Sequence, residues 1–388
     1  MRRLGPTVAR LHKMRRASMA AMAQIDAFGG TSGGGSPGRL QAMTGFGGNP
    51  GELIAKTYLP STLTPHAPLV VVLHGCTQTA AAYDHGSGWS DLADRHGFAL
   101  LFPEQTRGNN SNLCFNWFAT GDIRRGKGEA ASIAQMVRHM IATHDLDPRR
   151  VYINGLSAGG AMTAAMLATY PELFAGGAII AGLPYGVADN VPQALERMRG
   201  QGMPSRRALA SKIANASDHD GPWPTLSVWH GTADATVVPA NAGIIVDQWR
   251  DRVGITTAGE TDRVDGHQRT VWRDGSGKIA IERFDIAGMG HGTPLSTRGA
   301  ADCGHAGAHM LEAGICSTSR IAGSWGLTAK AAKQATVRAQ AVRPVATVAA
   351  PAIASSSKPR ARAAASAPRA TGVGAVIEDA LRAAGLMR

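Results

Sequence analysis

The segment 150–167, RVYINGLSAGGAMTAAML, constrains the fold of this 388-residue chain more than any other. Residues 151–153 have the pattern of a short buried strand, and the alanine-rich stretch after the glycines that of a helix. Between them, residues 155–159, GLSAG, match G-x-S-x-G in a strand–turn–helix context. Such a turn strains the backbone of Ser157, and flanking glycines avoid the collisions that Cβ atoms would cause. The motif predicts an exposed nucleophilic serine, with a glycine-rich turn and an incidental serine as the alternative.

Buried strands and helices alternate along the middle of the chain. The pattern predicts strands at 55–59, 67–75, 97–105, 151–153 and 224–231, two alternating strands within 267–286, and helices at 128–146 and 240–254. This alternation is typical of an α/β fold with a mostly parallel central sheet and helices on both faces. In such folds the functional sites form beyond the carboxyl ends of the strands. Functional residues are therefore expected directly after these strands.

The net charge of +12 is concentrated at the two ends of the chain. Residues 1–50 contain seven basic residues and one acidic residue, and residues 328–388 contain ten and two, whereas the middle contains 23 and 25. The composition predicts a basic extension with a Gly/Ser linker (1–45) and an ordered domain (46–327). After these comes an Ala/Pro/Arg-rich disordered tail that ends in a short amphipathic helix (328–388).

The basic tails suggest association with an anionic surface or a polymer granule. Because the central domain is nearly neutral, nucleic acid is not expected as the main partner. A granule- or nucleic-acid-binding protein with an idle core is an alternative. The sequence contains no run of 18 apolar residues, so no membrane span is predicted. Basic residues interrupt the N-terminal segment before an apolar core of signal-peptide length forms. The sequence therefore predicts a cytoplasmic location, with secretion by a non-standard route as the alternative.

The four cysteines are compatible with two disulfides but do not require them. The candidate pairs are Cys76–Cys114 and Cys303–Cys316, although a cytosolic protein would more often keep its thiols reduced. None of the cysteines has C-x-x-C spacing, and Cys303-Gly304-His305 offers too few ligands for zinc. No metal site is predicted.

A serine hydroxyl requires a base at neutral pH, and the base requires an orienting carboxylate. After a strand–turn–helix nucleophile the partners follow in the order Asp/Glu, then His. Asp234 lies just past a buried strand, and His291 lies between glycines in a loop after the last strand. Ser157, Asp234 and His291 are therefore the predicted catalytic residues. The weaker candidates are Asp218, Asp220, Asp247, His230, His267, His305 and His309.

The tetrahedral intermediate of acyl transfer requires two hydrogen-bond donors for its oxyanion. The backbone N–H groups of Ala158 and Cys76 are predicted for this role, because they follow the nucleophile and an early strand end. A disulfide to Cys114 is compatible with it, since the bridge uses the side chain. The predicted substrate-binding residues are His74, Trp89, Trp117 and Tyr185, and Phe115 and Phe118 lie in similar loops. The segment 187–222 is a candidate lid.

Eight segments of the chain together resemble the poly(3-hydroxybutyrate) depolymerase-like esterases. They are LHGCTQTAAAY, FPEQ, CFNWF, GEAASIAQMV, INGLSAGGAM, AGLPYG, WHGTAD and GMGHGTPL. The resemblance covers residues 45–327 and implies the α/β-hydrolase fold. It also implies ester hydrolysis by Ser157, Asp234 and His291 through an acyl-enzyme, with no metal or cofactor. The implied substrate is a hydroxyacyl ester or a polyhydroxyalkanoate. A feruloyl or acetyl esterase acting on polysaccharide is the alternative.

Overall fold

The computed structural model describes residues 38–298 and 303–328 of the chain. The predictions for residues 1–37 of the N-terminal extension, for the Ala/Pro/Arg-rich tail and for the C-terminal amphipathic helix lie outside the described residues. The end of the predicted extension is described, and its residues Gln41–Met43 form a strand that pairs with residues 55–57. No helix within the described ranges is long and apolar enough to cross a membrane.

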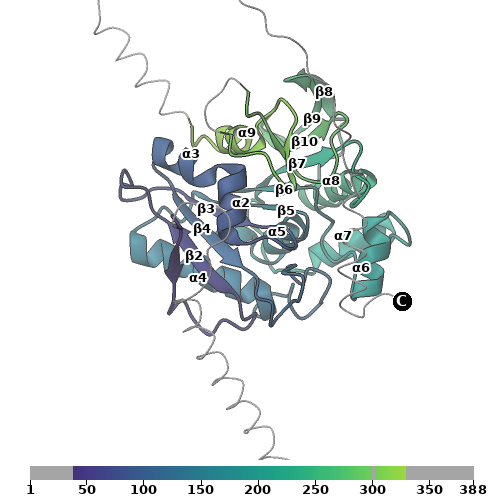
Figure 1. The fold of residues 1–388 in the computed structure, drawn as a ribbon. Helices are drawn as coiled ribbons and strands as arrows, with labels where there is room; N and C mark the ends of the chain where they lie inside the picture. The colour runs from purple at the N-terminus through teal and green to yellow at the C-terminus, as the bar shows by residue number, and fades with distance from the viewer. Residues whose placement is uncertain (1–37, 299–302, 329–388) are drawn as a thin grey trace, which may run out of the picture. The chain divides into compact units, whose positions relative to one another are not determined.

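A ten-stranded sheet lies at the centre of the fold, in the order β1-β2-β4-β3-β5-β6-β7-β10-β9-β8 (Figure 1). The six strands from β4 to β10 in this order pair in parallel, and the strands at both edges pair antiparallel. The strands of the sheet are β1 (Gln41–Met43), β2 (Ile54–Tyr58), β3 (Leu69–Leu73), β4 (Ala99–Glu104), β5 (Val151–Leu156), β6 (Gly176–Ile180), β7 (Thr225–Gly231), β8 (Glu260–Val264), β9 (His267–Arg273) and β10 (Ile279–Ile286). A separate pair joins β11 (Thr293–Leu295) to β12 (Met310–Glu312).

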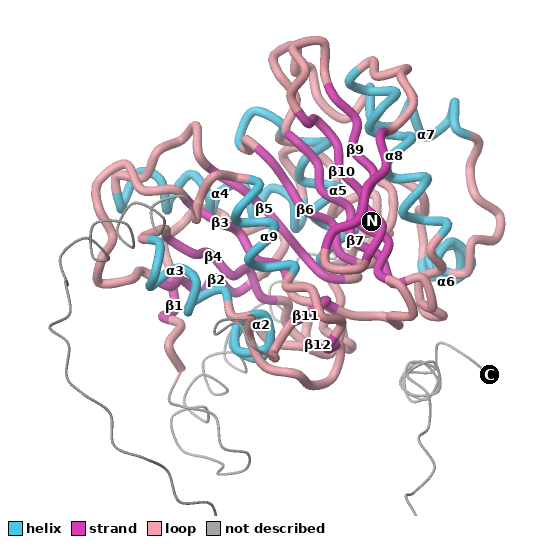
Figure 2. Tube along the Cα trace, turned by 90° about the horizontal axis from the view of Figure 1, so that it is seen from above, coloured by secondary structure: helices cyan, strands magenta, loops and turns pink. Residues whose placement is uncertain are grey.

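Helices cover both faces of the sheet, as the sequence predicted (Figure 2). On one face lie α4 (Gly128–His144), α5 (Ala158–Thr169) and α8 (Ala240–Val253). On the other face lie α2 (Ala80–Ser87), α3 (Trp89–His96) and α9 (Ser317–Ser324). The remaining helices are the 3-10 helix η1 (Pro171–Leu173), α6 (Val191–Met198) and α7 (Arg206–Ala214).

The central strands are buried on both faces. In β3, Leu69, Val71 and Leu73 join the core under α4 and α5, whereas Val70 and Val72 join the core under α2 and α3. This two-sided burial explains why β3 is a continuous apolar run rather than an alternating one. β6, with the sequence GGAII, was not predicted, because its two glycines weaken the strand pattern. The absence of a Cβ atom at Gly177 lets the side chain of Leu167 in α5 pack directly on the strand.

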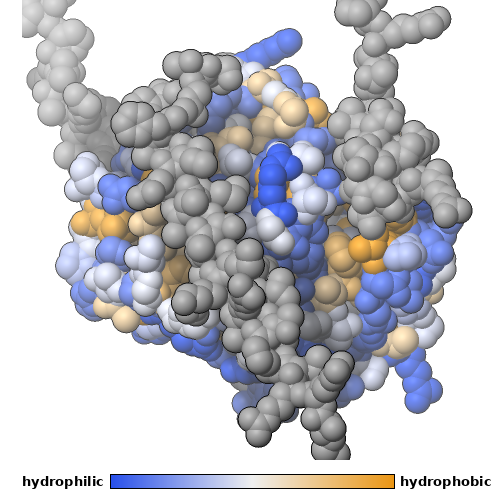
Figure 3. Space-filling model, turned by 60° about the horizontal axis from the view of Figure 1, so that its bottom comes forward, coloured by the Kyte–Doolittle hydropathy of each residue, from blue (hydrophilic) through white to orange (hydrophobic). Residues whose placement is uncertain are grey.

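Apolar side chains on the face of the molecule shown in Figure 3 form separate small areas between hydrophilic ones. Among the described residues, Ile54 is the one large hydrophobic residue that is exposed, at 42%. Most large apolar side chains of the described residues are therefore buried in the core. A ligand site is expected in a cleft between the elements rather than on an exposed apolar patch.

Candidate active site

Ser157 lies on the turn between β5 and α5. Its backbone has φ 56° and ψ −115°, a strained conformation for a residue with a side chain. A Cβ atom on Gly155 would collide with the Gly159 backbone, and one on Gly159 would collide with the Leu73 carbonyl. The Ser157 amide donates to the Ile180 carbonyl at 2.9 Å, which attaches the turn to β6. The glycines allow a close fit of turn, strand and helix that holds the serine side chain at the strand end.

Three side chains from distant parts of the chain form one hydrogen-bonded row. The Ser157 hydroxyl lies 2.9 Å from Nε2 of His291, and Nδ1 of His291 lies 2.7 Å from Oδ2 of Asp234. The side chain of Asp234 is fully buried and that of His291 is 6% exposed. The carboxylate accepts a hydrogen bond from the Nδ1–H group, which leaves Nε2 without a proton and able to accept the serine proton. The structure thus brings together the three residues that the sequence placed in one site.

The Asp234 carboxylate is held by the loop that follows β7. Its Oδ1 accepts from the amides of Thr236 and Val237 at 2.9 Å each, and Nε2 of His230 lies 3.3 Å from Oδ2. Burial by itself would raise the pKa of Asp234, but the hydrogen bonds from His230 and His291 outweigh it and hold the pKa well below its usual range. Asp234 therefore stays ionised throughout the neutral range.

Two backbone amides lie beside Ser157 with no acceptor in the described part of the chain. Ala158 is the first residue of α5, where the N–H has no partner within the helix, and the amide of Cys76 likewise donates to no described residue. The amides on either side of Cys76 are occupied, because Gly75 donates to Gln78 Oε1 and Thr77 to the Asn112 carbonyl. The arrangement suits an anion at the positive end of α5.

A cavity of about 170 Å³ opens at Ser157 and His291. One wall is apolar and includes Trp117, Phe118 and the α6 residues Val191, Ala194, Leu195 and Met198. A second part of the lining is polar and includes Gln78, Asn110, Ser111, Asn112 and His309. The segment 187–222 therefore reaches the site through α6, whose C-terminal Met198 carbonyl accepts from the Val238 amide near Asp234. The apolar residues of this short helix, Val191, Ala194, Leu195 and Met198, follow a helical spacing and are the sequence signal for this part of the lining.

Of the four predicted substrate-binding residues, Trp117 lines the cavity, whereas His74, Trp89 and Tyr185 do not, so this part of the prediction is corrected. His74 is 1% exposed and contacts the ring of Phe115 in the core behind the cavity. Trp89 belongs to α3 and stacks on Trp325 on the far face of the sheet. Tyr185 is 8% exposed and lines a separate hollow. Nearness to a strand end along the chain does not determine the direction of a side chain.

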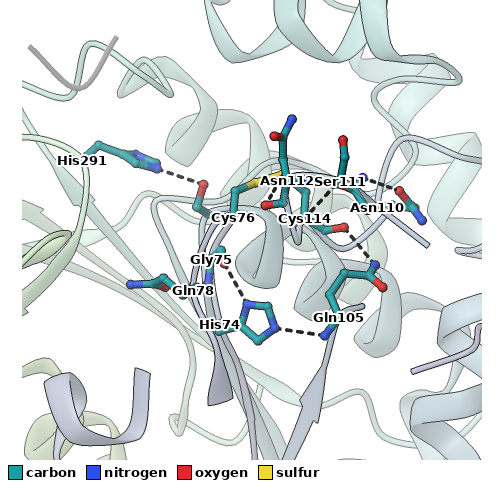
Figure 4. The surroundings of a disulfide bond; sticks show 12 residues. His74, Gly75, Cys76, Gln78, Gln105, Asn110, Ser111, Asn112, Cys114 and His291 are labelled. Atoms are coloured by element: carbon teal, nitrogen blue, oxygen red, sulfur yellow. Dashed lines mark hydrogen bonds between the residues drawn. A yellow bond between two sulfur atoms is a disulfide. The ribbon is translucent and has the colours of Figure 1, made fainter. Parts of the chain in front are cut away.

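Both candidate cysteine pairs are bonded in the structure, Cys76 to Cys114 and Cys303 to Cys316. The first pair lies at the wall of the cavity (Figure 4), and the second lies near α9. Within residues 38–298 and 303–328, no three His, Cys, Asp or Glu side chains are grouped so that they could hold a metal ion.

A strained serine between a parallel strand and a helix, a histidine and a buried aspartate define the class of serine hydrolases with the α/β-hydrolase fold. Comparison with known proteins identifies the family. The family model for "Esterase PHB depolymerase" matches residues 54–273, and the chain belongs to this family.

Two curated relatives and one solved structure illustrate the range of this similarity. Poly(3-hydroxyalkanoate) depolymerase C of Paucimonas lemoignei is 47% identical over 292 residues, which cover 74% of this chain and 70% of the relative. Feruloyl esterase B of Talaromyces funiculosus is 30% identical over 66% of this chain and 73% of the relative. The structure of acetyl xylan esterase from Aspergillus awamori matches 75% of this chain and 100% of its own, with a TM-score of 0.64 and 24% identity, and supports the fold. The chain is therefore a carboxylic ester hydrolase of the serine type.

Proposed function

We propose that this protein hydrolyses hydroxyacyl esters, polyhydroxyalkanoate in particular, with Ser157 as nucleophile, His291 as base and Asp234 as orienting acid. The observation that carries the proposal is the hydrogen-bonded row from Ser157 through His291 to Asp234, beside two amides that have no acceptor among the described residues. This arrangement has the geometry that nucleophilic acyl transfer requires.

In the proposed mechanism, Ser157 Oγ attacks the ester carbonyl carbon while its proton passes to Nε2 of His291. The carbonyl oxygen becomes an oxyanion that the amides of Cys76 and Ala158 stabilise. The intermediate collapses, and the leaving alcohol takes the proton from His291 as the acyl group stays on Ser157. Water then attacks the acyl-enzyme with His291 again as base, which releases the acid and restores the serine. Asp234 stabilises the imidazolium in both halves.

A hydroxyalkanoate fits the two unlike walls of the cavity. Its short alkyl side groups match the apolar wall of Trp117, Phe118 and α6, and its closely spaced ester and hydroxyl oxygens match the amide-bearing wall of Gln78, Asn110 and Asn112. The relative with 47% identity is named as a poly(3-hydroxyalkanoate) depolymerase, which supports the same substrate class. Feruloyl or acetyl esters of polysaccharides are the second candidate, since a relative with 30% identity is named as a feruloyl esterase.

The decisive experiment compares the wild type with Ser157→Ala on amorphous polyhydroxybutyrate granules, on p-nitrophenyl butyrate and on a feruloyl ester. The substitution should lower turnover by at least about 10³-fold, because it removes the nucleophile. Release of 3-hydroxybutyrate by the wild type alone would support the polyester substrate. Cleavage of the feruloyl ester without release from granules would favour the second candidate. Turnover that survives in the Ser157→Ala variant would overturn the triad.

The cellular location and the role of the tails are separate parts of the proposal. The two disulfides favour an oxidising compartment over the cytoplasmic location that the sequence predicted, because cytosolic thiols are usually kept reduced. Association of the basic tails with a granule or another anionic surface is supported by their charge. Removal of residues 1–37 and 329–388, which leaves β1 in place, should weaken granule binding and its salt dependence while cleavage of p-nitrophenyl butyrate is kept.

A further inference from the structure

Glu129, in the first turn of α4, is a buried carboxylate outside the triad. Its side chain is completely shielded from solvent. Oε1 accepts from the side-chain amides of Gln105, Asn109 and Asn116 at 2.6, 3.1 and 2.8 Å, and Oε2 accepts from the backbone N–H of Asn116 at 2.8 Å. All four partners are N–H donors. Burying them costs free energy unless they share a strong acceptor, and a carboxylate is such an acceptor.

The three residues bound by Glu129 all belong to the loop 105–118, whose residues Asn110, Ser111 and Asn112 supply polar lining of the cavity. Asn116 Oδ1 accepts from Asn110, whose own side-chain oxygen accepts from the amides of Asn112 and Cys114. Gln105 also donates to the Cys114 carbonyl at 2.9 Å. One carboxylate therefore organises both ends and the middle of this loop.

The loop 105–118 is joined in turn to the segment that carries the Cys76 amide. The Cys76–Cys114 disulfide is the covalent link, and the Thr77 amide donates to the Asn112 carbonyl at 2.7 Å. The backbone N–H of Gln105 donates to Nε2 of His74 at 3.1 Å. Nδ1 of His74 is therefore the protonated nitrogen, and it donates to the Gly75 carbonyl at 2.8 Å. Figure 4 shows Gln105 close to both His74 and Cys114, with Cys76 on the side of His291.

We propose that Glu129 is a positioning residue of this esterase: it fixes the loop 105–118 and, through Cys114 and Asn112, the Cys76 amide that binds the oxyanion. The proposal rests on the proposed function of Ser157 and of the Cys76 amide. Glu129 itself lies away from the cavity lining and acts through other residues. Its removal should therefore weaken stabilisation of the transition state more than binding of the ester in its ground state.

A glutamine at position 129 is nearly isosteric but supplies one acceptor oxygen in place of two. In either orientation its NH₂ group faces N–H donors, the Asn116 backbone amide on one side or the three side-chain amides on the other. Burial, together with the nearby Asp122 carboxylate, raises the pKa of Glu129 to about 8, against the hydrogen bonds from Gln105, Asn116 and Asn109 that lower it. The difference between wild type and Glu129→Gln should therefore be larger at pH 9, where Glu129 is ionised, than at pH 7.

The experiment measures kcat and KM for p-nitrophenyl butyrate, and Ki for butylboronic acid, at pH 7 and pH 9. The boronate forms a tetrahedral adduct with the serine and so reports on the oxyanion site. At pH 9, Glu129→Gln should lower kcat about 10-fold, raise the Ki for butylboronic acid by a similar factor and change KM less than about 3-fold. The matched control is Glu282→Gln, a carboxylate 8% exposed on β10 whose Oε1 accepts from Ser227 at 2.8 Å. Its kcat should stay within about 2-fold of the wild type.

Asn116→Ala removes one side-chain donor to Glu129 and the link to Asn110, and serves as the milder second variant. It should lower kcat about 3-fold at pH 9. If Glu129→Gln does not fold, Asn116→Ala provides the test of the proposal. The proposal is overturned by a folded Glu129→Gln or Asn116→Ala variant with wild-type kcat, or by a loss of kcat that leaves the boronate Ki unchanged. These results are independent of Ser157→Ala: activity that survives that substitution overturns the proposed function instead.

Discussion

The two sides of the cavity are built in different ways. On the nucleophile side, Ser157 is placed by the close approach of main chains, where Gly155 and Gly159 leave no room for side chains. On the oxyanion side, the Cys76 amide is placed by a disulfide and a network of side-chain amides around Glu129. The first construction depends on a few residues adjacent in the chain, whereas the second depends on residues from three separate segments. We expect substitutions on the first side to abolish activity or folding, and those on the second to reduce activity in steps.

Asp234→Asn should have the largest effect, a loss of about 10³–10⁴-fold in kcat. Because Oδ1 of Asp234 accepts two backbone amides, the asparagine oxygen should take that place and its NH₂ should face His291 Nδ1. His291 would then carry its proton on Nε2 and could not accept the proton of Ser157. Steady-state kinetics on p-nitrophenyl butyrate measure the loss, with Asp218→Asn as the control within about 2-fold of the wild type. A small loss for Asp234→Asn would show that the orientation of His291 does not depend on this acid.

Gly159→Ala tests the construction of the nucleophile side by stability. A Cβ atom there would meet the carbonyls of Leu73 and His74, both backbone groups that cannot rotate away. The free energy of unfolding should fall by at least about 3 kcal/mol, measured by urea denaturation. Gly275→Ala, in the turn between β9 and β10 with open space around its Cβ position, should change it by less than about 0.5 kcal/mol. Equal effects of the two substitutions would contradict the close packing at Gly159.

The two disulfides give the smallest predicted effect on kcat and a direct contrast within one protein. Their cysteines are 38 and 13 positions apart in the sequence, so each disulfide should stabilise the fold by about 3–4 kcal/mol if it acts by lowering the entropy of the unfolded chain. The double variant Cys76→Ala/Cys114→Ala should also lower kcat about 10-fold. This is less than the roughly 10²–10³-fold cost of losing a donor, because the Thr77–Asn112 bond still holds the segment. Cys303→Ala/Cys316→Ala should lose stability with less than about 3-fold change in kcat. Equal kcat losses would mean that the first bridge has no special role at the oxyanion site.

The sequence was sufficient for the parts of this protein that depend on local patterns. The alternation of strands and helices indicated the α/β class, and β6 was missed because Gly176 and Gly177 resemble a turn. Ser157, Asp234 and His291 could be chosen because each lies directly after a strand or between glycines. The strands themselves bring these positions to the same edge of the sheet.

Only the tertiary structure decided which side chains face the cavity and which hold it in place. His74, Trp89 and Tyr185 lie near strand ends along the chain, yet all three are buried elsewhere because packing determines their direction. The lining by α6 and the network around Glu129 likewise join segments that are far apart in sequence. Sequence determined where the nucleophile, acid and base occur, since the periodicity of strands and the turn chemistry of glycine are local. The walls of the cavity and the support of the Cys76 amide were decided by long-range packing and hydrogen bonding, which no local pattern encodes.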